Sequence, residues 1–293
     1  MKRYAYFPGC SLEKMAQSYN HSAIATMRVL GVELEEIEDW NCCGATAYFH
    51  VDELLAYTLC ARNLAMAEKQ NLDVVAPCSG CYKNLYFTRA HLQHEPDLAD
   101  HINFALEEDK LHYSGTSAVR HLIEVFVQDV GLDAVKSKVT HPLKDLRVAP
   151  YYGCQILRPR KDHEDVEQAQ YFEDLMTAIG AAPVDFPLKL RCCSGSLVLT
   201  NRKAALSLVR NLLESAGAAG AQVIATACPL CQVNLECYQN QVNQEFGTDL
   251  HMPVMYFTQL VGLAFGLQPK PLGIGTELVS TKPIVCHARQ DSA

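Results

Sequence analysis

Short apolar segments alternate along the chain with stretches in which apolar residues recur every three or four positions. YAYFPGC at residues 4–10 has the aromatic-rich composition of a buried strand. The apolar residues that follow have helical spacing, and the pattern ends at Gly31. We therefore expect a strand, a turn with Cys10, and a helix over residues 12–30 whose apolar face comprises Leu12, Met15, Ala16, Tyr19, Ala23, Met27 and Leu30.

The same alternation continues toward the end of the chain. DVVAP at 73–77 and QVIAT at 222–226 predict short buried strands, each leading into a Cys-X-X-Cys turn and a helix. Two more helices are predicted, one marked by Val166, Phe172, Leu175, Met176 and Ile179 up to Gly180, and one by Leu206, Val209, Leu212 and Leu213 up to about Gly217. Strands that alternate with helices indicate an α/β fold with mostly parallel sheets.

A cysteine pattern occurs twice and divides the chain into two copies. Each copy has a single cysteine, an adjacent pair and a Cys-X-X-Cys, and 34 residues separate the pair from the Cys-X-X-Cys both times. Asn-Leu follows at the same offset in both copies. The sequence therefore predicts a tandem duplication of two pseudo-symmetric α/β units. We place a first domain at residues 1–145, a second at 146–270 and a C-terminal tail at 271–293.

Composition and charge narrow the class of protein. With 293 residues, 49% hydrophobic and 20% charged, the chain is long and apolar enough to bury a sizeable core. A net charge of −8 without a basic cluster argues against nucleic acid as the main partner. The most apolar stretch, residues 254–267, is shorter than the roughly 20 residues that span a bilayer. A buried core helix is favoured there over a peripheral membrane role.

The number and setting of the cysteines indicate the cellular compartment of the protein and the role of its thiols. The start MKRYAYFPGC lacks the pattern of a secretory signal, and the chain has 13 cysteines. Together these features favour a cytoplasmic protein whose thiols stay reduced and bind metal, rather than a disulfide framework. The motif cysteines are expected at the carboxyl ends of parallel strands, so that five thiolates of each copy converge on one crevice.

The number and softness of the ligands narrow the choice of metal. A structural zinc site takes four ligands, and the usual cubane cluster takes three of its cysteines from one tight run that this sequence lacks. The residues alone leave two possibilities, a four-ligand site with one free thiol or a less usual cluster that uses all five. They favour iron and sulfide over zinc.

The complete pattern resembles a known family. YFPGCS at 6–11, NCCGA at 41–45 and TQLVGLAFG at 258–266 are similar to the cysteine-rich CCG domain, and the full arrangement resembles the B-type subunit of heterodisulfide reductase and its bacterial relatives. One departure is Ser194, which stands where the first copy has Gly44. The resemblance implies two non-cubane [4Fe-4S] clusters. Their ligands would be Cys10, Cys42, Cys43, Cys78 and Cys81 in the first copy, and Cys154, Cys192, Cys193, Cys228 and Cys231 in the second.

The resemblance also implies a reaction and partners. It implies reduction or formation of a disulfide, or of a related sulfur substrate, between the two clusters, with the chemistry at the cluster irons and no catalytic side chain assigned. The sequence has neither a ferredoxin motif nor a dinucleotide fingerprint. Electrons are therefore expected from two other proteins that resemble the family's partners, a ferredoxin-like iron-sulfur subunit (C-type) and a flavoprotein subunit (A-type).

Two alternatives stay open at this point. The first alternative is an electron-transfer or anchoring subunit of a succinate, fumarate or hydroxyacid dehydrogenase complex, because relatives with the same cysteine pattern serve in such complexes. The second is a zinc-stabilised interaction module without a redox role.

Several other residues have a structural and a functional interpretation. Aromatic residues near the motifs are expected in the core or along a substrate pocket: Tyr6, Phe7, Trp40, Tyr48, Phe49, Tyr151 and Tyr152. His50 is interpreted either as a surface residue or as a proton donor. Arg191 is interpreted either as a solvated residue or as a residue that raises the potential of the cluster beside Cys192. Asn84 and Asn234 are interpreted as hydrogen-bond donors to cluster sulfur or to local backbone. The sequence predicts a polar loop at 158–163, buried thiols at Cys60 and Cys237, and a free thiol in a polar tail at Cys286.

Overall fold

Two four-stranded parallel sheets form the framework of the protein. The computed structural model describes residues 1–45, 47–157 and 169–290. The sheets have the orders β2-β1-β3-β4 and β6-β5-β7-β8, and every pairing is parallel. The strands are β1 (Lys2–Tyr6), β2 (Val32–Glu36), β3 (Val74–Ala76), β4 (Val119–His121), β5 (Arg147–Tyr151), β6 (Ala182–Pro183), β7 (Val223–Thr226) and β8 (Val254–Tyr256). The prediction of two α/β units with parallel sheets is confirmed.

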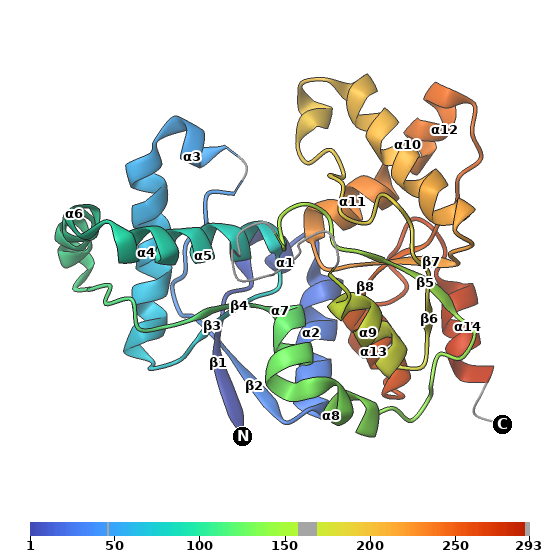
Figure 1. Cartoon of the computed structure of the whole chain (residues 1–293), viewed down its shortest axis with the longest axis horizontal. Helices are drawn as coiled ribbons and strands as arrows, with labels where there is room; N and C mark the ends of the chain where they lie inside the picture. The colour runs from blue at the N-terminus through green and yellow to red at the C-terminus, as the bar shows by residue number, and fades with distance from the viewer. Residues whose placement is uncertain (46, 158–168, 291–293) are drawn as a thin grey trace.

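Helices lie between the two sheets and on their outer sides (Figure 1). In Figure 1, α2, α9 and α13 lie between the sheets, α4 to α6 lie beside the first sheet, and α10 to α12 lie beside the second. The helices are α1 (Gly9–Glu13), α2 (Gln17–Val29), α3 (Tyr48–Val51), α4 (Glu53–Lys69), α5 (Ser79–His94), α6 (Pro96–Leu106), α7 (Leu122–Glu124), α8 (Leu132–Ser137), α9 (Tyr171–Ala178), α10 (Arg202–Ala218), α11 (Pro229–Cys237), α12 (Gln239–Phe246), α13 (Phe257–Ala264) and α14 (Lys282–Gln290). Shorter or irregular helical segments are η1 (Glu107–Asp109), η2 (Val125–Gly131), η4 (Leu197–Leu199) and η5 (Lys270–Leu272).

The helix expected over residues 12–30 is confirmed from Gln17 to Val29 as α2, but its first residues belong to a separate helix, α1. The carbonyl of Ser11 accepts hydrogen bonds from the backbone of Lys14 at 3.2 Å and of Ala16 at 2.8 Å, which closes α1 in a turn. The chain then restarts as α2 from a non-helical Ala16. Met15, which was expected on the buried face, is 69% exposed. The spacing of the apolar residues along the sequence does not indicate this turn.

The other helix predictions have different outcomes. The helix expected at 206–213 is confirmed as part of α10, which runs from Arg202 to Ala218. The helix expected between Val166 and Ile179 is observed as α9, Tyr171–Ala178, while Val166 and the predicted loop at 158–163 lie outside the described residues.

Aromatic residues join the two copies at the centre of the molecule. The ring of Phe257, in α13 of the second copy, makes edge-to-face contacts with Phe126 and with Phe172. The hydroxyls of Ser22 and Thr258 lie 2.6 Å apart, which links α2 of the first copy to α13 of the second. Because the rings are fully buried, the two units share one apolar core rather than merely touching.

The most apolar segment and helix α14 both pack on this core. Residues 254–267 contain β8 and α13, and every residue of both elements is buried, so the prediction of a core helix is confirmed. In α14, Ile284 and Ala288 are buried. Within the described part of the chain, no helix combines the length and apolarity needed to cross a membrane.

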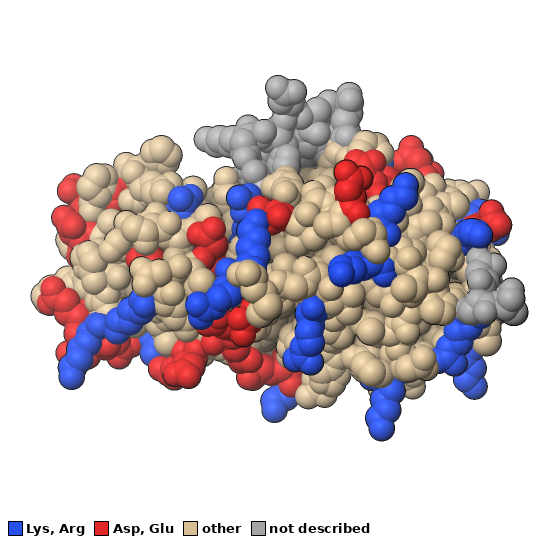
Figure 2. All heavy atoms as spheres, turned by 90° about the horizontal axis from the view of Figure 1, so that it is seen from below, with Lys and Arg blue, Asp and Glu red and all other residues tan. Residues whose placement is uncertain are grey.

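Charged side chains are mixed on the surface. On the face that Figure 2 shows, acidic and basic side chains are interspersed, and acidic ones are more frequent over the half that holds the first copy. Lys and Arg are spread over this face without a continuous patch.

Candidate functional site

The cysteine motifs lie at the carboxyl ends of the strands. Cys10 is in α1, directly after β1, and the Cys42-Cys43 pair lies in the loop that follows β2. Cys78 is the N-cap of α5 after β3, and Cys228 is the N-cap of α11 after β7. Parallel strands place their carboxyl ends at one edge of a sheet, which brings sequence-distant thiols together.

All ten motif cysteines line one cavity of about 520 Å³. The sequence predicted that the five thiols of each copy converge, and the resemblance implied a substrate between the two sets. In the structure both sets surround one shared space. The cysteines that line it are Cys10, Cys42, Cys43, Cys78, Cys81, Cys154, Cys192, Cys193, Cys228 and Cys231. None of the 13 cysteines forms a disulfide.

The two copies meet at their Cys-X-X-Cys turns. The thiols of Cys78 and Cys228 lie close enough across the boundary between the copies to shift each other's pKa, which is raised for Cys78 and lowered for Cys228. Beside them, the Ser79 hydroxyl donates to the Ala227 carbonyl at 3.3 Å, and the Tyr19 hydroxyl donates to the Pro77 carbonyl at 3.1 Å. These contacts make the two thiol sets neighbours within a single site.

Within each copy the buried cysteine of the pair is strongly acidic. Hydrogen bonds from Cys42 and then from Cys81 hold the pKa of the Cys43 thiol well below its usual range, and the Cys43 and Cys81 sulfurs lie 3.3 Å apart. The pKa of Cys193 is lowered in the same way, first by Cys192. A thiolate is the form that binds a metal, and in each copy the surroundings favour it at the same position of the pair.

Glycines before the single cysteines let the chain approach the thiols closely. Gly9 and Gly153 have positive φ angles of 69° and 68°. A Cβ atom on Gly9 would lie 2.9 Å from the Cys81 sulfur, and one on Gly153 would lie 3.2 Å from the Cys231 sulfur. The positive φ angle and the close contact with sulfur both require glycine. In both copies the backbone therefore packs in the same way against the second cysteine of the Cys-X-X-Cys.

The Ser194 departure leaves the backbone unchanged. Gly44 has a φ angle of 67°, and Ser194, which occupies the equivalent position, has a φ angle of 81°. The serine therefore adopts the left-handed conformation that glycine adopts without strain.

The two asparagines hold the cysteine pairs through backbone. The Asn84 amide donates to the Cys43 carbonyl at 2.8 Å, and the Asn234 amide donates to the Cys193 carbonyl at 3.0 Å. The Asn234 amide also reaches the Cys193 sulfur at 3.4 Å. The backbone interpretation holds in both copies, and a contact with sulfur is added in the second.

One buried histidine beside the cavity was missed in the sequence. His121 ends β4, is fully buried, and its Nε2 lies 3.4 Å from the Ser79 hydroxyl between the two Cys-X-X-Cys turns. Burial lowers the pKa of His121 to about 4. Tyr256 ends β8 at the matching place of the second sheet. One sequence signal could have indicated His121. HLIE at 121–124 and YFTQ at 256–259 occupy equivalent places in the two copies, and each starts a helix with a capping box, formed by Glu124 in the first copy and by Gln259 in the second.

The remaining candidates divide between the cavity and the core. Phe49, Tyr152 and an exposed His50 line the cavity, together with Lys83, which sequence reasoning did not single out. The other aromatic candidates do not line it: Tyr6, Phe7, Trp40, Tyr48 and Tyr151. Arg191 is exposed.

The three cysteines outside the motifs are set apart from the cavity lining. Cys60 is buried as predicted, and burial raises the pKa of its thiol. Cys237 is half-buried rather than buried. Cys286 is an exposed free thiol as predicted, and it lies on helix α14.

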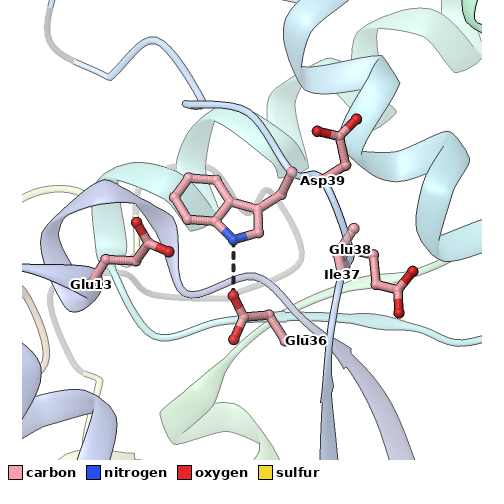
Figure 3. Close-up of a pocket in the computed structure, with 6 residues that line it drawn as sticks. Glu13, Glu36, Ile37, Glu38 and Asp39 are labelled. Carbon is pink, nitrogen blue, oxygen red and sulfur yellow. Dashed lines mark hydrogen bonds between the residues drawn. The ribbon is translucent and has the colours of Figure 1, made fainter.

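A second, acidic pocket of about 430 Å³ lies beside the segment that leads to the first cysteine pair. It is lined by Glu13, Glu36, Ile37, Glu38, Asp39 and Trp40. The Trp40 indole donates to the Glu36 carboxylate at 3.1 Å (Figure 3). In the same view the Glu13 carboxylate lies on the other side of the indole from Asp39 and Glu38. These carboxylates are kept out of the thiol-lined cavity, whose lining includes none of them.

The donor set suits iron-sulfur clusters. Ten thiols around a common space are soft ligands of the kind that such clusters use. No three His, Cys, Asp or Glu side chains of the described residues converge as ligands of a single ion. The thiols surround an open space rather than the position of a single ion.

Comparison with known proteins places this arrangement in a family. The cysteine-rich domain model named CCG matches residues 4–86 and again residues 148–236. The chain belongs to the CCG family. Each match covers the first three strands of one sheet in chain order, and β4 and β8 follow the matched residues. The resemblance stated from the cysteine motifs is confirmed.

Curated relatives match over nearly the whole chain. The protein is 39% identical to the 8-methylmenaquinol:fumarate reductase membrane anchor subunit of Wolinella succinogenes, over 95% of this chain and 97% of that one. It is 32% identical to the B-type subunit of a CoB-CoM heterodisulfide reductase of Methanosarcina acetivorans, over 94% of this chain and 93% of that one. The CCG domains and these relatives indicate an iron-sulfur subunit of an oxidoreductase complex.

A solved structure has the same fold. A hypothetical protein from Helicobacter pylori superposes with a TM-score of 0.78 at 16% identity. The match covers 95% of this chain and 52% of that chain, so this protein spans about half the length of that structure.

Proposed function

We propose that this CCG protein is the catalytic iron-sulfur subunit of a heterodisulfide reductase-like complex. The first set of five cysteines, in residues 1–145, would hold one non-cubane [4Fe-4S] cluster, and the second set, in residues 146–270, would hold another. The observation that carries the proposal is that all ten thiols line one cavity and that Cys78 and Cys228 meet inside it. Two separate electron-relay sites would have no need of a shared space.

The shared cavity suits a reaction on a sulfur-sulfur bond. Reduction of a disulfide breaks the S–S bond and takes up two electrons and two protons to give two thiols. Two clusters held by the ten cysteines would supply these electrons one at a time. Phe49, Tyr152 and Leu230 give the cavity apolar wall that limits water around the sulfurs. The reverse reaction forms the disulfide and releases two electrons and two protons.

Electrons would arrive through other subunits. The relatives are named as subunits, and we assign a ferredoxin-like iron-sulfur subunit and a flavoprotein subunit as partners.

A second function is favoured by the relative at 39% identity, whose name is that of a membrane anchor subunit of a fumarate reductase. In that function the chain relays electrons within a succinate, fumarate or hydroxyacid dehydrogenase complex and does not act on a sulfur substrate. The shared cavity favours the first function, and the higher identity favours this second one.

One experiment separates the candidates. Anaerobically purified protein is analysed for iron, zinc and acid-labile sulfide, and its electron paramagnetic resonance (EPR) spectrum is recorded after oxidation with and without thiols. The proposal expects about eight irons and eight sulfides per chain, from two four-iron clusters, and a signal that thiols alter. Eight irons with a thiol-insensitive signal support the electron relay instead. Zinc without sulfide supports a zinc-stabilised module and rejects both redox functions.

A further inference from the structure

The backbone carbonyl directly before each cysteine pair accepts a hydrogen bond from a buried side chain. In the first copy the Asn63 amide donates to the Asn41 carbonyl at 3.0 Å. In the second copy the Tyr151 hydroxyl donates to the Arg191 carbonyl at 2.6 Å. Asn41 and Arg191 each stand immediately before a Cys-Cys pair, so the two carbonyls are equivalent. The copies therefore use donors of different chemistry for the same backbone group.

The two donors lie on different elements of their copies. Asn63 is in α4, and its amide oxygen also accepts from the Asn41 backbone N–H at 3.0 Å, so one side chain binds both backbone groups of one residue. Tyr151 is the last residue of β5. Because a buried amide or hydroxyl is costly to leave unpaired, each contact fixes the backbone beside a cysteine pair.

Each copy lacks the donor that the other copy uses. Counted back from the single cysteine of each copy, Phe7 stands where the second copy has Tyr151, and phenylalanine has no hydroxyl. Helices α4 and α10 both have 17 residues and both begin after a residue whose side chain caps the helix, which aligns Asn63 with Leu212. The Leu212 side chain is buried and has no donor. The equivalent carbonyl thus has a donor in both copies although neither donor residue is repeated.

The contact with Asn63 continues into the first cysteine pair. The Asn41 side chain donates to the Cys42 carbonyl at 3.1 Å, and the Asn84 amide donates to the Cys43 carbonyl at 2.8 Å. Three successive carbonyls, those of residues 41–43, therefore each accept from a side-chain amide. This backbone carries both thiols of the pair, so a shift at Asn41 moves the sulfurs.

We propose that Asn63 and Tyr151 are positioning residues, each of which holds one cysteine pair in the geometry that binds a cluster by fixing the carbonyl before that pair. The inference rests on the proposed cluster ligands and is independent of any sulfur substrate. Neither residue lines the cavity, so both act through the backbone. Loss of one donor loosens the pair of its own copy and leaves the other pair in place.

The test exchanges the donors between the copies and measures how fast each pair reacts with iodoacetamide. Anaerobically purified protein is labelled, and the labelled cysteines are identified by peptide mass spectrometry. Asn63→Leu, which introduces the residue of the second copy, is expected to speed labelling of the first pair about tenfold through local opening and to leave the second pair unchanged. Tyr151→Phe, which introduces the residue of the first copy, is expected to do the reverse. Both variants should also alter the shape of the EPR signal, because a displaced ligand changes the geometry of its cluster.

Two control variants remove contacts of the same kind away from the cysteine pairs. The Asn103 side chain accepts from the Tyr113 backbone N–H at 2.8 Å and donates to its carbonyl at 3.1 Å. The Tyr4 hydroxyl donates to the Asp129 carboxylate at 2.8 Å. Asn103→Leu and Tyr4→Phe are expected to keep both pairs at wild-type labelling rates and to leave the EPR signal unchanged.

The outcomes separate this inference from the function on which it rests. Wild-type labelling of the adjoining pair in either variant overturns the role of that residue, and an equal rise at both pairs shows general loosening and overturns the inference. Should Asn63→Leu fail to fold, Asn63→Asp, which retains the acceptor for the Asn41 N–H and lacks the amide donor, takes its place. Iron and sulfide are measured on the same samples. A wild type without them overturns the proposed function, while the labelling rates of its thiols still decide whether Asn63 and Tyr151 position the pairs.

Discussion

The rings of Tyr19 and Tyr256 stack face to face at the boundary between the two copies. Their centroids lie 4.2 Å apart and their planes differ by 6°. Tyr19 is fully buried in α2, and its hydroxyl donates to the Pro77 carbonyl, one residue before Cys78. The stack therefore connects the common core to the turn that positions a cavity thiol.

Replacement of Tyr19 should weaken both the core and the site. We expect Tyr19→Ala to lower the free energy of unfolding by about 4 kcal/mol, since it removes a fully buried aromatic ring. Tyr19→Phe keeps the ring and loses only the hydrogen bond, at a cost of about 1 kcal/mol. Anaerobic urea denaturation measures both. Phe104→Ala, at a 76% exposed aromatic residue, is the control and should change stability by less than about 0.5 kcal/mol. Equal losses for Tyr19→Ala and the control would contradict the importance of the stack.

Gly9 should be essential for the first set of thiols for a reason beyond its backbone angle. Gly9 and Gly31 have similar φ angles, 69° and 72°, but an added Cβ meets the Cys81 sulfur only at Gly9 and nothing within 4 Å at Gly31. Both alanine variants carry the backbone strain, about 1 kcal/mol. Only Gly9→Ala displaces a thiol. We expect it to purify with about four irons per chain instead of eight, and Gly31→Ala with the full content. Equal iron content in the two variants would refute the contact.

The sequence predicted the framework of this protein because the relevant signals are local or repeated. Apolar runs before Cys78 and Cys228 correspond to β3 and β7, and the repeat of cysteine spacings predicted the two similar α/β units with parallel sheets. Since parallel strands end at one edge, the convergence of the thiols followed from topology alone.

The parts that could not be predicted depend on contacts between the copies. Nothing in the spacing indicated that Cys78 and Cys228 meet, because the repeat describes each copy by itself. His121 and Tyr19 were missed or assigned to packing for the same reason, since their partners lie in distant segments. The break between α1 and α2 was missed because a local turn at Ser11 overrides the apolar spacing.

The two equivalent asparagines should differ in their contribution to stability. Asn84 donates to one carbonyl, that of Cys43, whereas the Asn234 amide contacts the carbonyls of Cys193 and Gly195. We expect Asn84→Ala to cost about 1 to 2 kcal/mol and Asn234→Ala about 1 kcal/mol more, because a second, part-buried carbonyl also loses its donor. Urea denaturation midpoints give the comparison. An equal or reversed order would show that the contact with Gly195 contributes nothing.

The buried His121 should make the protein sensitive to mild acid. Its pKa is lowered by burial from 6.5 to about 4, so between these values the unfolded chain takes up a proton that the folded chain refuses. The contribution of His121 to the free energy of unfolding is fully present above about pH 6.5 and is lost as the pH falls toward 4. Between about pH 7 and pH 5, the loss amounts to about 2 kcal/mol.

A substitution isolates this contribution from those of the other histidines. The Nδ1 atom of His121 accepts a hydrogen bond from the Ile123 backbone at 3.2 Å, and an asparagine oxygen replaces that acceptor without titrating. We expect His121→Asn to flatten the decline of urea midpoints between about pH 7 and pH 5, whereas His112→Asn, at an exposed position, leaves it unchanged. The Glu124 carboxylate, which accepts from the His121 backbone at 2.9 Å, is present in both variants. A decline that persists in His121→Asn would assign the acid sensitivity to other groups, and His121 would then have only a packing role.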